Sequence, residues 1–282
     1  MFTFTSHIKE TVIKAKKKIN VLKALAGTEW GCDKETMTNT YKTIGRSQLE
    51  YGAPIWSPLI KESLMDSLQT VQNNALRIAT GSFKMAAMDH LHRETKVLPV
   101  KVHTQMITKQ YLAACHLPGH PGREQLSRPP SIRNHKPTIL QYREEIGSYF
   151  TNSNDETTYK AAIKCIHKKT VAATLSSYPP NKVLGTAPPE INPEEEDLPR
   201  KSRSLLSQLR SGYSKLLNSY NHRLNENTPD SCPKCSTSPH TTTHLFSCPD
   251  TPTELTPLSL WLQPKTTANY LNLEREEDPD VT

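Results

Sequence analysis

The chain of 282 residues contains few of the side chains that build a large hydrophobic core. Hydrophobic residues make up only 35% of it and aromatic residues 6%, while 22 prolines outnumber 10 glycines. A chain of this length can bury about 75% of the surface that its unfolded form exposes. Because apolar side chains are scarce and prolines are frequent, we expect helical clusters joined by stiff connections, with less core than the length allows.

Long hydrophobic runs are also missing. No stretch approaches the ~20 consecutive apolar residues that span a bilayer. The first residues, M-F-T-F-T-S-H-I, lack the basic start and apolar centre of a secretory signal peptide. The sequence therefore predicts no membrane partner and an intracellular location, nuclear and/or cytoplasmic.

Motifs of several enzyme classes do not occur. The sequence has no His-Glu-x-x-His, no Gly-x-Ser-x-Gly elbow and no glycine-rich loop that would cradle a phosphate. These absences argue against an independent enzyme such as a zinc hydrolase, and we predict no catalytic residue in the chain. His90, His92 and His103 lack partners at ligand spacing, and Asp89 and Glu94 are interpreted as surface groups.

The six cysteines do not form a disulfide framework. Cys32, Cys115 and Cys165 are scattered, and the other three fall in one short segment. This distribution favours a reducing compartment.

The short segment has the spacing of a metal site. It is Cys232-x2-Cys235-x8-His244-x3-Cys248, which offers three thiolates and one imidazole. Zinc binds such a set tetrahedrally, and four protein ligands leave no open position, so we predict a structural Zn²⁺ site rather than a hydrolytic centre. Because the segment is too polar to bury a core, the metal must supply its folding energy, roughly 10–16 kcal/mol for sites of this kind.

Other readings of the same residues stay open at this point. His240 could replace His244 as the fourth ligand, but it leaves seven residues before Cys248. A disulfide or a fortuitous cluster of cysteine and histidine is the remaining alternative.

The chain is basic, with a net charge of +7 and an isoelectric point near 9.0. Such a charge favours an anionic partner, most commonly RNA or DNA. Two expected helices carry the candidate contacts, and a solvated basic face is the alternative for the first of them. The candidate nucleic-acid-binding residues are Lys14, Lys16, Lys17, Lys18, Arg200, Lys201, Arg203, Arg210 and Lys215.

Apolar spacing predicts a mainly α fold. Steps of three and four residues indicate helices over 8–26, from Asp33 to about residue 51, from after Pro58 to Gly81, over 89–96 and over 100–115. Residues 138–178 are weakly helical, and a basic helix is expected from about 198 to 224, directly before the Cys/His segment.

Several long strings carry a resemblance to a known family. They are L-K-A-L-A-G-T-E-W-G, Y-K-T-I-G-R-S-Q-L-E-Y-G-A-P-I-W-S-P, L-Q-T-V-Q-N-N-A-L-R-I-A-T-G, D-H-L-H-R-E-T-K-V-L-P-V, L-R-S-G-Y-S-K-L-L-N-S-Y, C-P-K-C, H-L-F-S-C-P and L-W-L-Q-P. In this order, over nearly the whole chain, they resemble the carboxy-terminal portion of jockey-type non-LTR retrotransposon reverse transcriptases. The resemblance implies a helical thumb followed by a segment with a Cys/His zinc motif, to which Cys232, Cys235, His244 and Cys248 correspond.

Turn chemistry, helical spacing and the resemblance together predict an organisation of the chain. The expected segments are a thumb-like helical domain over 1–117, a linker over 118–137, a helical segment over 138–178, a proline-rich acidic linker over 179–199 with a solvated acidic run, a basic helix with a zinc knuckle over 200–263, and an acidic tail over 264–282. In the family, this portion follows an endonuclease and a polymerase core of palm and fingers.

One departure from the family bears on activity. Polymerases of this kind hold magnesium with palm aspartates, usually in an aromatic-x-Asp-Asp signature, and this chain contains no Asp-Asp pair. Without paired carboxylates it cannot activate a primer hydroxyl. We therefore expect a fragment that does not polymerise DNA, with Mg²⁺ and the palm and fingers belonging to the missing core.

Two functions fit these expectations. The first is a non-catalytic remnant that binds RNA or DNA through basic helices and a structural zinc motif. The second is a structural or protein-interaction module, whose helices once docked on the polymerase and which has no affinity for nucleic acid.

Overall fold

The computed structural model describes residues 4–27, 31–128 and 137–273. These residues are mainly helical, which confirms the predicted fold class. Within them the only strand-like pairing is an isolated antiparallel bridge between Ser231 and Pro239. None of the helices in the described ranges is both long enough and apolar enough to cross a membrane.

The chain forms two compact units, and neither is a continuous stretch of sequence. Unit 1 takes its described residues from Met1–Lys18, Thr43–Gln72 and Leu98–Tyr178, and unit 2 from Ile19–Lys42, Asn73–Val97 and Pro179–Thr282. This partition divides the segment 1–117, which the sequence analysis treats as one helical domain.

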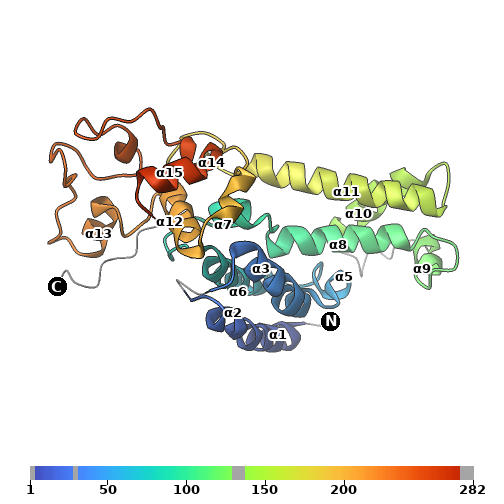
Figure 1. The fold of residues 1–282 in the computed structure, drawn as a ribbon. Helices are drawn as coiled ribbons and strands as arrows, with labels where there is room; N and C mark the ends of the chain where they lie inside the picture. Colours follow the sequence, from blue (N-terminus) through green and yellow to red (C-terminus); the bar gives the residue numbers. More distant parts are fainter. Residues whose placement is uncertain (1–3, 28–30, 129–136, 274–282) are drawn as a thin grey trace. The chain divides into compact units, whose positions relative to one another are not determined.

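Unit 1 is built around a long helix, α8, which packs against α5, α10 and α11 (Figure 1). Met106 and Ala113 of α8 share an apolar core with buried side chains from the helices around it, among them Ile146, Phe150 and Ile166. Its elements are α1 (Thr5–Lys18), α4 (Ser47–Glu50), α5 (Ala53–Trp56), α8 (Val100–Ala114), α9 (Arg123–Ser127), α10 (Pro137–Gly147), η2 (Ser148–Phe150) and α11 (Glu156–Ser177).

The predicted apolar stripes are buried, but the first expected helix is divided. Ile8 and Ala15 of α1 have no exposed surface, as expected for its inward face. The helix ends at Lys18, however, and Leu22, which is fully buried, belongs to the separate α2 (Asn20–Ala24). The helix after Pro58 is α6 (Glu62–Thr80), and Gly81 ends it with φ +70°, as predicted.

Unit 2 assembles short helices around α12. They include α2 and the last part of α6, together with α3 (Lys34–Thr40), α7 (Met88–Thr95), η3 (Pro193–Asp197), α12 (Arg200–Ser211), α13 (Asn218–Leu224), η4 (His244–Phe246), α14 (Ser259–Leu262) and α15 (Pro264–Tyr270). Asp33 caps α3 by accepting a hydrogen bond from the Thr36 amide at 2.7 Å, which confirms the predicted cap. A single turn of π-helix, η1 (Tyr41–Arg46), follows α3 directly.

The basic helix expected from 198 to 224 is two helices. Gly212 adopts φ +73° and ends α12, with the Gly212 amide donating to the Leu209 carbonyl and the Tyr213 amide to the Gln208 carbonyl. This arrangement is a Schellman motif, which stops a helix by closing its last carbonyls. Leu206 and Leu209 of α12 then pack with Trp261 in the core of unit 2.

Two segments expected to be a linker and a tail are more ordered than predicted. The segment 118–137 contains α9, and the Leu126 carbonyl accepts a bond from Arg143 at 2.6 Å; residues 129–136 lie outside the described residues. In the segment 264–282, α15 and the buried Leu273 belong to the core, so the expectation of a tail was wrong up to that residue. The acidic stretch from 274 to 280 lies outside the described residues.

The prediction that the acidic run of 194–197 is solvated was also wrong for one residue. Glu195 lies in the turn η3 and is only 2% exposed, although its neighbour Glu196 is exposed. Glu94, predicted as a surface group, is likewise buried at 6% exposure. Both carboxylates have cationic partners that come from distant parts of the chain.

Candidate metal centre

The first two candidate ligands lie in a tight hairpin before α14. The Cys232 amide donates to the Ser238 carbonyl at 2.8 Å, and the His240 amide donates to the Asp230 carbonyl at 2.7 Å. At the tip, the Ser236 amide donates back to the Cys232 carbonyl at 2.9 Å, and Ser236 adopts φ +55°. This turn brings the thiols of Cys232 and Cys235 to the same side of the hairpin.

The other two candidate ligands lie at the start of the turn η4 and just after its end. His244 begins it, and Cys248 follows it; both side chains are buried. The segment is anchored to the rest of unit 2 by Thr242, whose hydroxyl donates to the Leu209 carbonyl of α12 at 3.1 Å, and by the hydroxyl of Tyr270, which donates to the Leu245 carbonyl at 3.2 Å. The centre is therefore attached to the same core that holds α12.

Two of the distances between the four ligand atoms are close to the edges of a tetrahedral site. The four atoms lie within 4.8 Å of one another, with 3.9 Å between the sulfurs of Cys232 and Cys248 and 3.3 Å from the Cys235 sulfur to His244 Nε2. A tetrahedral Zn²⁺ with Zn–S of about 2.3 Å and Zn–N of about 2.0–2.1 Å requires about 3.8 Å and 3.6 Å for these edges. The Cys₃His cluster could therefore hold a metal ion, and its donor set suits zinc.

The thiol environments also favour ligation. The Thr237 side chain donates to the Cys235 sulfur at 3.2 Å, and together with the other hydrogen bonds to this sulfur it lowers the pKa of Cys235 to about 6. Burial instead raises the pKa of Cys232. Cys235 is thus ready to bind a cation as a thiolate near neutral pH, whereas Cys232 needs the cation itself to lose its proton.

The structure distinguishes between the two candidate histidines. His240 lies outside the four-residue cluster. Its Nδ1 accepts a bond from the Asn218 amide at 3.2 Å, and its carbonyl accepts one from the Ser219 hydroxyl at 2.9 Å. His240 therefore joins the hairpin to the start of α13, and His244 is the fourth residue of the candidate centre. All six cysteines of the chain are unpaired.

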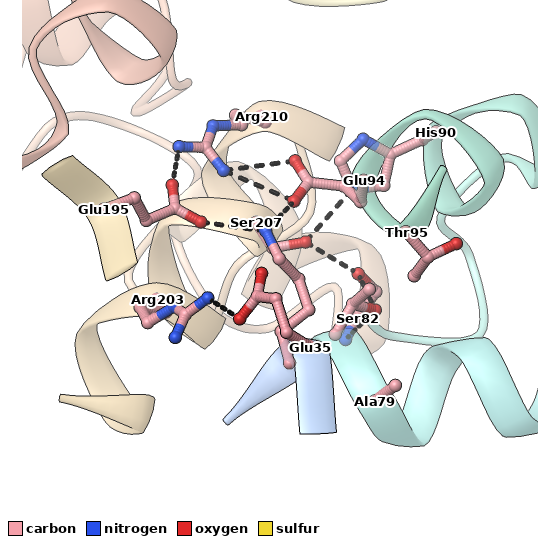
Figure 2. Close-up of polar contacts among 12 residues, drawn as sticks. Glu35, Ala79, Ser82, His90, Glu94, Thr95, Glu195, Arg203, Ser207 and Arg210 are labelled. Atoms are coloured by element: carbon pink, nitrogen blue, oxygen red, sulfur yellow. Dashed lines mark hydrogen bonds and ion pairs between the residues drawn. The ribbon is translucent and has the colours of Figure 1, made fainter. Parts of the chain in front are cut away.

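Elsewhere in unit 2, Arg210 forms the middle of a buried charge network. Its side chain has no exposed surface. Figure 2 shows Glu94 and Glu195 reaching its guanidinium from two sides. The Lys34 ammonium lies 3.2 Å from Glu94 and 2.9 Å from Glu195, which closes a ring of two cations and two carboxylates. Arg210 also donates twice to the Leu260 carbonyl, at 2.9 and 2.6 Å.

The charges of this ring keep its members ionised in spite of burial. Burial alone would raise the pKa of Glu94, but the charges of Arg210 and Lys34 lower it to about 2. The pKa of Glu195 is lowered by the same two cations against the same burial. Because cations and carboxylates are equal in number, the ring is neutral as a whole, and it joins α3, α7, η3, α12 and α14.

A serine and a histidine next to the ring resemble part of a catalytic group. His90 Nε2 lies 3.3 Å from the Ser207 hydroxyl, which in turn lies 3.1 Å from Ser82 (Figure 2). Burial lowers the pKa of His90, and Ser207 is only 1% exposed. A substrate cannot reach these atoms in this conformation, so their hydrogen bonds serve to join α7 and α12.

The predicted nucleic-acid-binding residues of α12 are mostly occupied within the protein. Arg210 is enclosed, and Arg203 is 6% exposed and paired with Glu35. Arg200 donates to the carbonyls of Ile78 at 3.0 Å and Cys32. A side chain without exposed surface cannot contact a nucleic acid, so the prediction for Arg210 is corrected here, and that for Arg203 fits poorly.

The remaining predicted contacts lie where a partner could reach them. Lys16, Lys17 and Lys18 are exposed at the end of α1 and form no ion pair within the described residues, while Lys14 is exposed and paired with Glu10 at 2.7 Å. Lys215 is exposed on the loop after α12, and Lys201 is half-buried.

The sequence analysis missed the buried carboxylates, although α12 carried a signal. Arg203, Leu206 and Arg210 are spaced three and four apart, so both arginines share the buried face of the helix. A helix with no acidic residue and cations on its inward face requires carboxylates from elsewhere in the chain.

Comparisons with models of protein families, with curated proteins and with solved structures find no match to this chain.

Proposed function

We propose that the chain is a non-catalytic carboxy-terminal portion of a non-LTR retrotransposon reverse transcriptase, acting inside the cell, in the nucleus and/or cytoplasm. In this proposal it binds RNA or DNA through exposed basic residues and is organised by a structural zinc ion. The observation that carries the proposal is the Cys₃His cluster, whose four ligand atoms lie within 4.8 Å of one another in a chain of net charge +7.

The zinc ion would supply folding energy. Cys232, Cys235, His244 and Cys248 would hold it, and four protein ligands leave no position for a reacting water. The hairpin around these residues has almost no apolar core of its own, because Pro233, Lys234 and Ser236 are exposed. The ion would therefore fix the hairpin against α12 and α13.

Nucleic-acid binding would be electrostatic. Lys16, Lys17 and Lys18 place three exposed ammonium groups on the last turn of α1, beside the carbonyl end of the helix. The same charges also interact favourably with the helix dipole, which accounts for part of their placement without a ligand. Phosphate contacts from such lysines carry no sequence preference, so the proposal predicts binding that is weakly selective and strongly salt-dependent.

The test is the salt dependence of binding to a labelled single-stranded RNA and to a DNA of the same sequence, measured by fluorescence anisotropy. Removing three phosphate contacts reduces the slope of log K against log salt by about 2. We expect this reduction for Lys16→Gln/Lys17→Gln/Lys18→Gln. The matched control is Lys61→Gln/Lys84→Gln/Lys160→Gln, which removes the same charge from three exposed positions in separate segments of the chain. Absence of binding by the unmodified zinc-loaded chain at low salt would refute the proposal.

A second function has one observation in its favour. Tyr51 and Ile55, close in sequence on unit 1, are 78% and 68% exposed. Exposed apolar side chains of this size are typical of surfaces that dock on another protein. If the chain is an interaction module without nucleic-acid affinity, Tyr51→Ser/Ile55→Ser should abolish self-association in sedimentation experiments, and the unmodified chain should not bind the oligonucleotides.

A further inference from the structure

Two cations in unit 2 surround a single tyrosine ring on the loop after α12. The Lys182 ammonium lies 3.9 Å from the centroid of the Tyr213 ring, and the Arg223 guanidinium carbon lies 5.9 Å from it. Lys182 and Arg223 are exposed, and Tyr213 is half-buried. The three residues come from three separate segments of the chain.

The backbone holds Lys182 in place on one side. Asn181 accepts a hydrogen bond from the Val183 amide at 2.8 Å, which fixes a turn, and its side-chain amide donates to the Arg210 carbonyl at 3.1 Å. The stem of Lys182 then passes over Gly212, where an added Cβ would lie 3.5 Å from Lys182 Cδ. The Lys182 ammonium is thereby directed towards the residue that follows Gly212.

The Tyr213 ring is held by other aromatic rings. It meets the edge of Tyr220 with centroids 6.0 Å apart and an interplanar angle of 65°, and Tyr220 stacks on Phe83 at 5.1 Å. Tyr220 is itself part of the buried core of unit 2. Because the ring is packed in this way, a ligand that contacts it and its cations needs to order little of the protein.

The cluster has no opposing charge of its own. Within the described residues, neither Lys182 nor Arg223 forms an ion pair with a carboxylate, whereas Arg203 and Arg210 both do. Partial burial would raise the pKa of Tyr213, but a hydrogen bond with Lys182 and the charges of Lys182 and Arg223 lower it. The region around the phenol oxygen is therefore positive and accessible to solvent.

We propose that Lys182 and Arg223, together with the Tyr213 hydroxyl, bind a phosphate of a nucleic-acid backbone. A guanidinium and an ammonium that both lie against one phenol ring, with no carboxylate paired to them, are suited to the several oxygens of a phosphate, and the phenol can donate one further hydrogen bond. This inference rests on the proposed nucleic-acid function and assigns one contact to it. The site belongs to unit 2, whereas the lysines of α1 belong to unit 1.

The experiment uses the full zinc-loaded chain and a labelled single-stranded RNA, with affinity measured over a range of salt concentrations. We expect Lys182→Gln/Arg223→Gln to reduce the slope of log K against log salt by about 0.7, since the two side chains share one phosphate and each phosphate contact to a single strand contributes about 0.7. Tyr213→Phe keeps the ring and removes the hydroxyl, so it should weaken binding several-fold with the slope unchanged. The control is Lys61→Gln/Lys84→Gln, which removes two exposed charges elsewhere.

The possible results separate this inference from the function on which it rests. If the unmodified chain binds RNA and the double variant keeps the full slope, the phosphate site is wrong and the proposed function stands. If the unmodified chain binds neither this RNA nor a DNA of the same sequence, both are wrong. If inorganic phosphate at constant ionic strength displaces the RNA as efficiently as unlabelled RNA does, the cluster binds an isolated anion and the assignment to a nucleic-acid backbone is refuted. Circular dichroism spectra of the variants verify that they are folded.

Discussion

Replacing Glu94 by glutamine tests the buried charge ring directly. The Glu94 carboxylate accepts from Arg210 Nη1 at 3.2 and 3.3 Å and from the Lys34 ammonium at 3.2 Å, and its side chain is 2% exposed. The substitution preserves the shape of the side chain but removes one of the two negative charges. Arg210 and Lys34 then share Glu195 alone, with an uncompensated positive charge in the interior.

Two independent arguments give the loss in free energy of unfolding that Glu94→Gln should cause. Removing one partner of a buried ion pair costs about 3–5 kcal/mol in measured systems. The pKa of Glu94 is lowered from 4.5 to about 2 by the charges of Arg210 and Lys34, in spite of its burial. A shift of this size corresponds to about 3 kcal/mol of preference for the ionised form in the folded state. We therefore expect Glu94→Gln to lower the free energy of unfolding of unit 2 by about 3–5 kcal/mol.

The lowered pKa of Glu94 also determines how the stability of unit 2 depends on pH. Because the pKa of Glu94 is lower in the folded than in the unfolded state, its contribution is fully present above about pH 4.5 and is lost as the pH falls from there towards 2. The pKa of Glu195 is shifted in the same direction, so its loss adds to that of Glu94. The stability of unit 2 should decline over this acidic range, and it should decline less in Glu94→Gln.

Unfolding of unit 2 can be followed through one fluorophore. The Trp261 ring lies 5.8 Å from the Arg210 guanidinium carbon, so its fluorescence reports on the region of the ring. In a Trp30→Phe/Trp56→Phe background, urea unfolding of Glu94→Gln is compared with that of Glu196→Gln, which removes an exposed carboxylate. The control should change the free energy by no more than about 0.5 kcal/mol.

A double substitution completes the test. Adding Lys34→Met to Glu94→Gln restores the balance of one cation to one carboxylate. The double variant should therefore lose about 1–3 kcal/mol less free energy of unfolding than the two single variants lose in sum. If Glu94→Gln costs less than 1 kcal/mol, or if the two substitutions are additive, the ring does not stabilise the fold in the way described.

Three further predictions concern the centre and the ends of helices. Native mass spectrometry should find one zinc ion per chain, lost in Cys235→Ser and retained in Cys165→Ser; a metal-free unmodified chain would contradict the site. Asp33→Ala removes the cap of α3 and should destabilise unit 2 by about 1 kcal/mol, whereas Asp33→Asn should retain most of the cap. Gly212→Ala forces a side chain into φ +73° and should cost about 1–2 kcal/mol in the same urea assay, and an unchanged midpoint would refute the role of the Schellman motif.

Features that depend on neighbours in the sequence could be predicted. The cap at Asp33, the end of α6 at Gly81 and the buried stripe of Leu68 and Val71 are decided within a few residues, so spacing and residue type suffice. The metal spacing is of the same kind, because its four ligands lie in two short motifs, Cys232-x2-Cys235 and His244-x3-Cys248. The choice of His244 over His240 required the bend of the hairpin, which spacing does not specify.

Features that depend on partners far away in the sequence could not be predicted. Glu195 looks solvated within its acidic run, and only Arg210, 15 residues on, and Lys34, 161 residues before, make its burial favourable. Arg203 looks available to a polyanion until its partner, 168 residues away, is known. Charge alone therefore overestimated the nucleic-acid surface of α12, because a buried cation and an exposed one look the same in a sequence.

The interleaving of the two units has a consequence for synthesis on the ribosome. Unit 2 takes Ile19–Lys42 and Asn73–Val97 from the first part of the chain but needs Pro179–Thr282 to be completed. Chains are synthesised at about 5–20 residues per second, and Glu195 lies 161 residues after Lys34. Glu195 is therefore added on the order of 10–30 s after Lys34. The last segment of unit 1 ends at Tyr178, so all residues of unit 1 are synthesised before those of unit 2 are complete. A product terminated after Tyr178 should therefore contain a folded unit 1, and the incomplete segments of unit 2 should be sensitive to proteolysis.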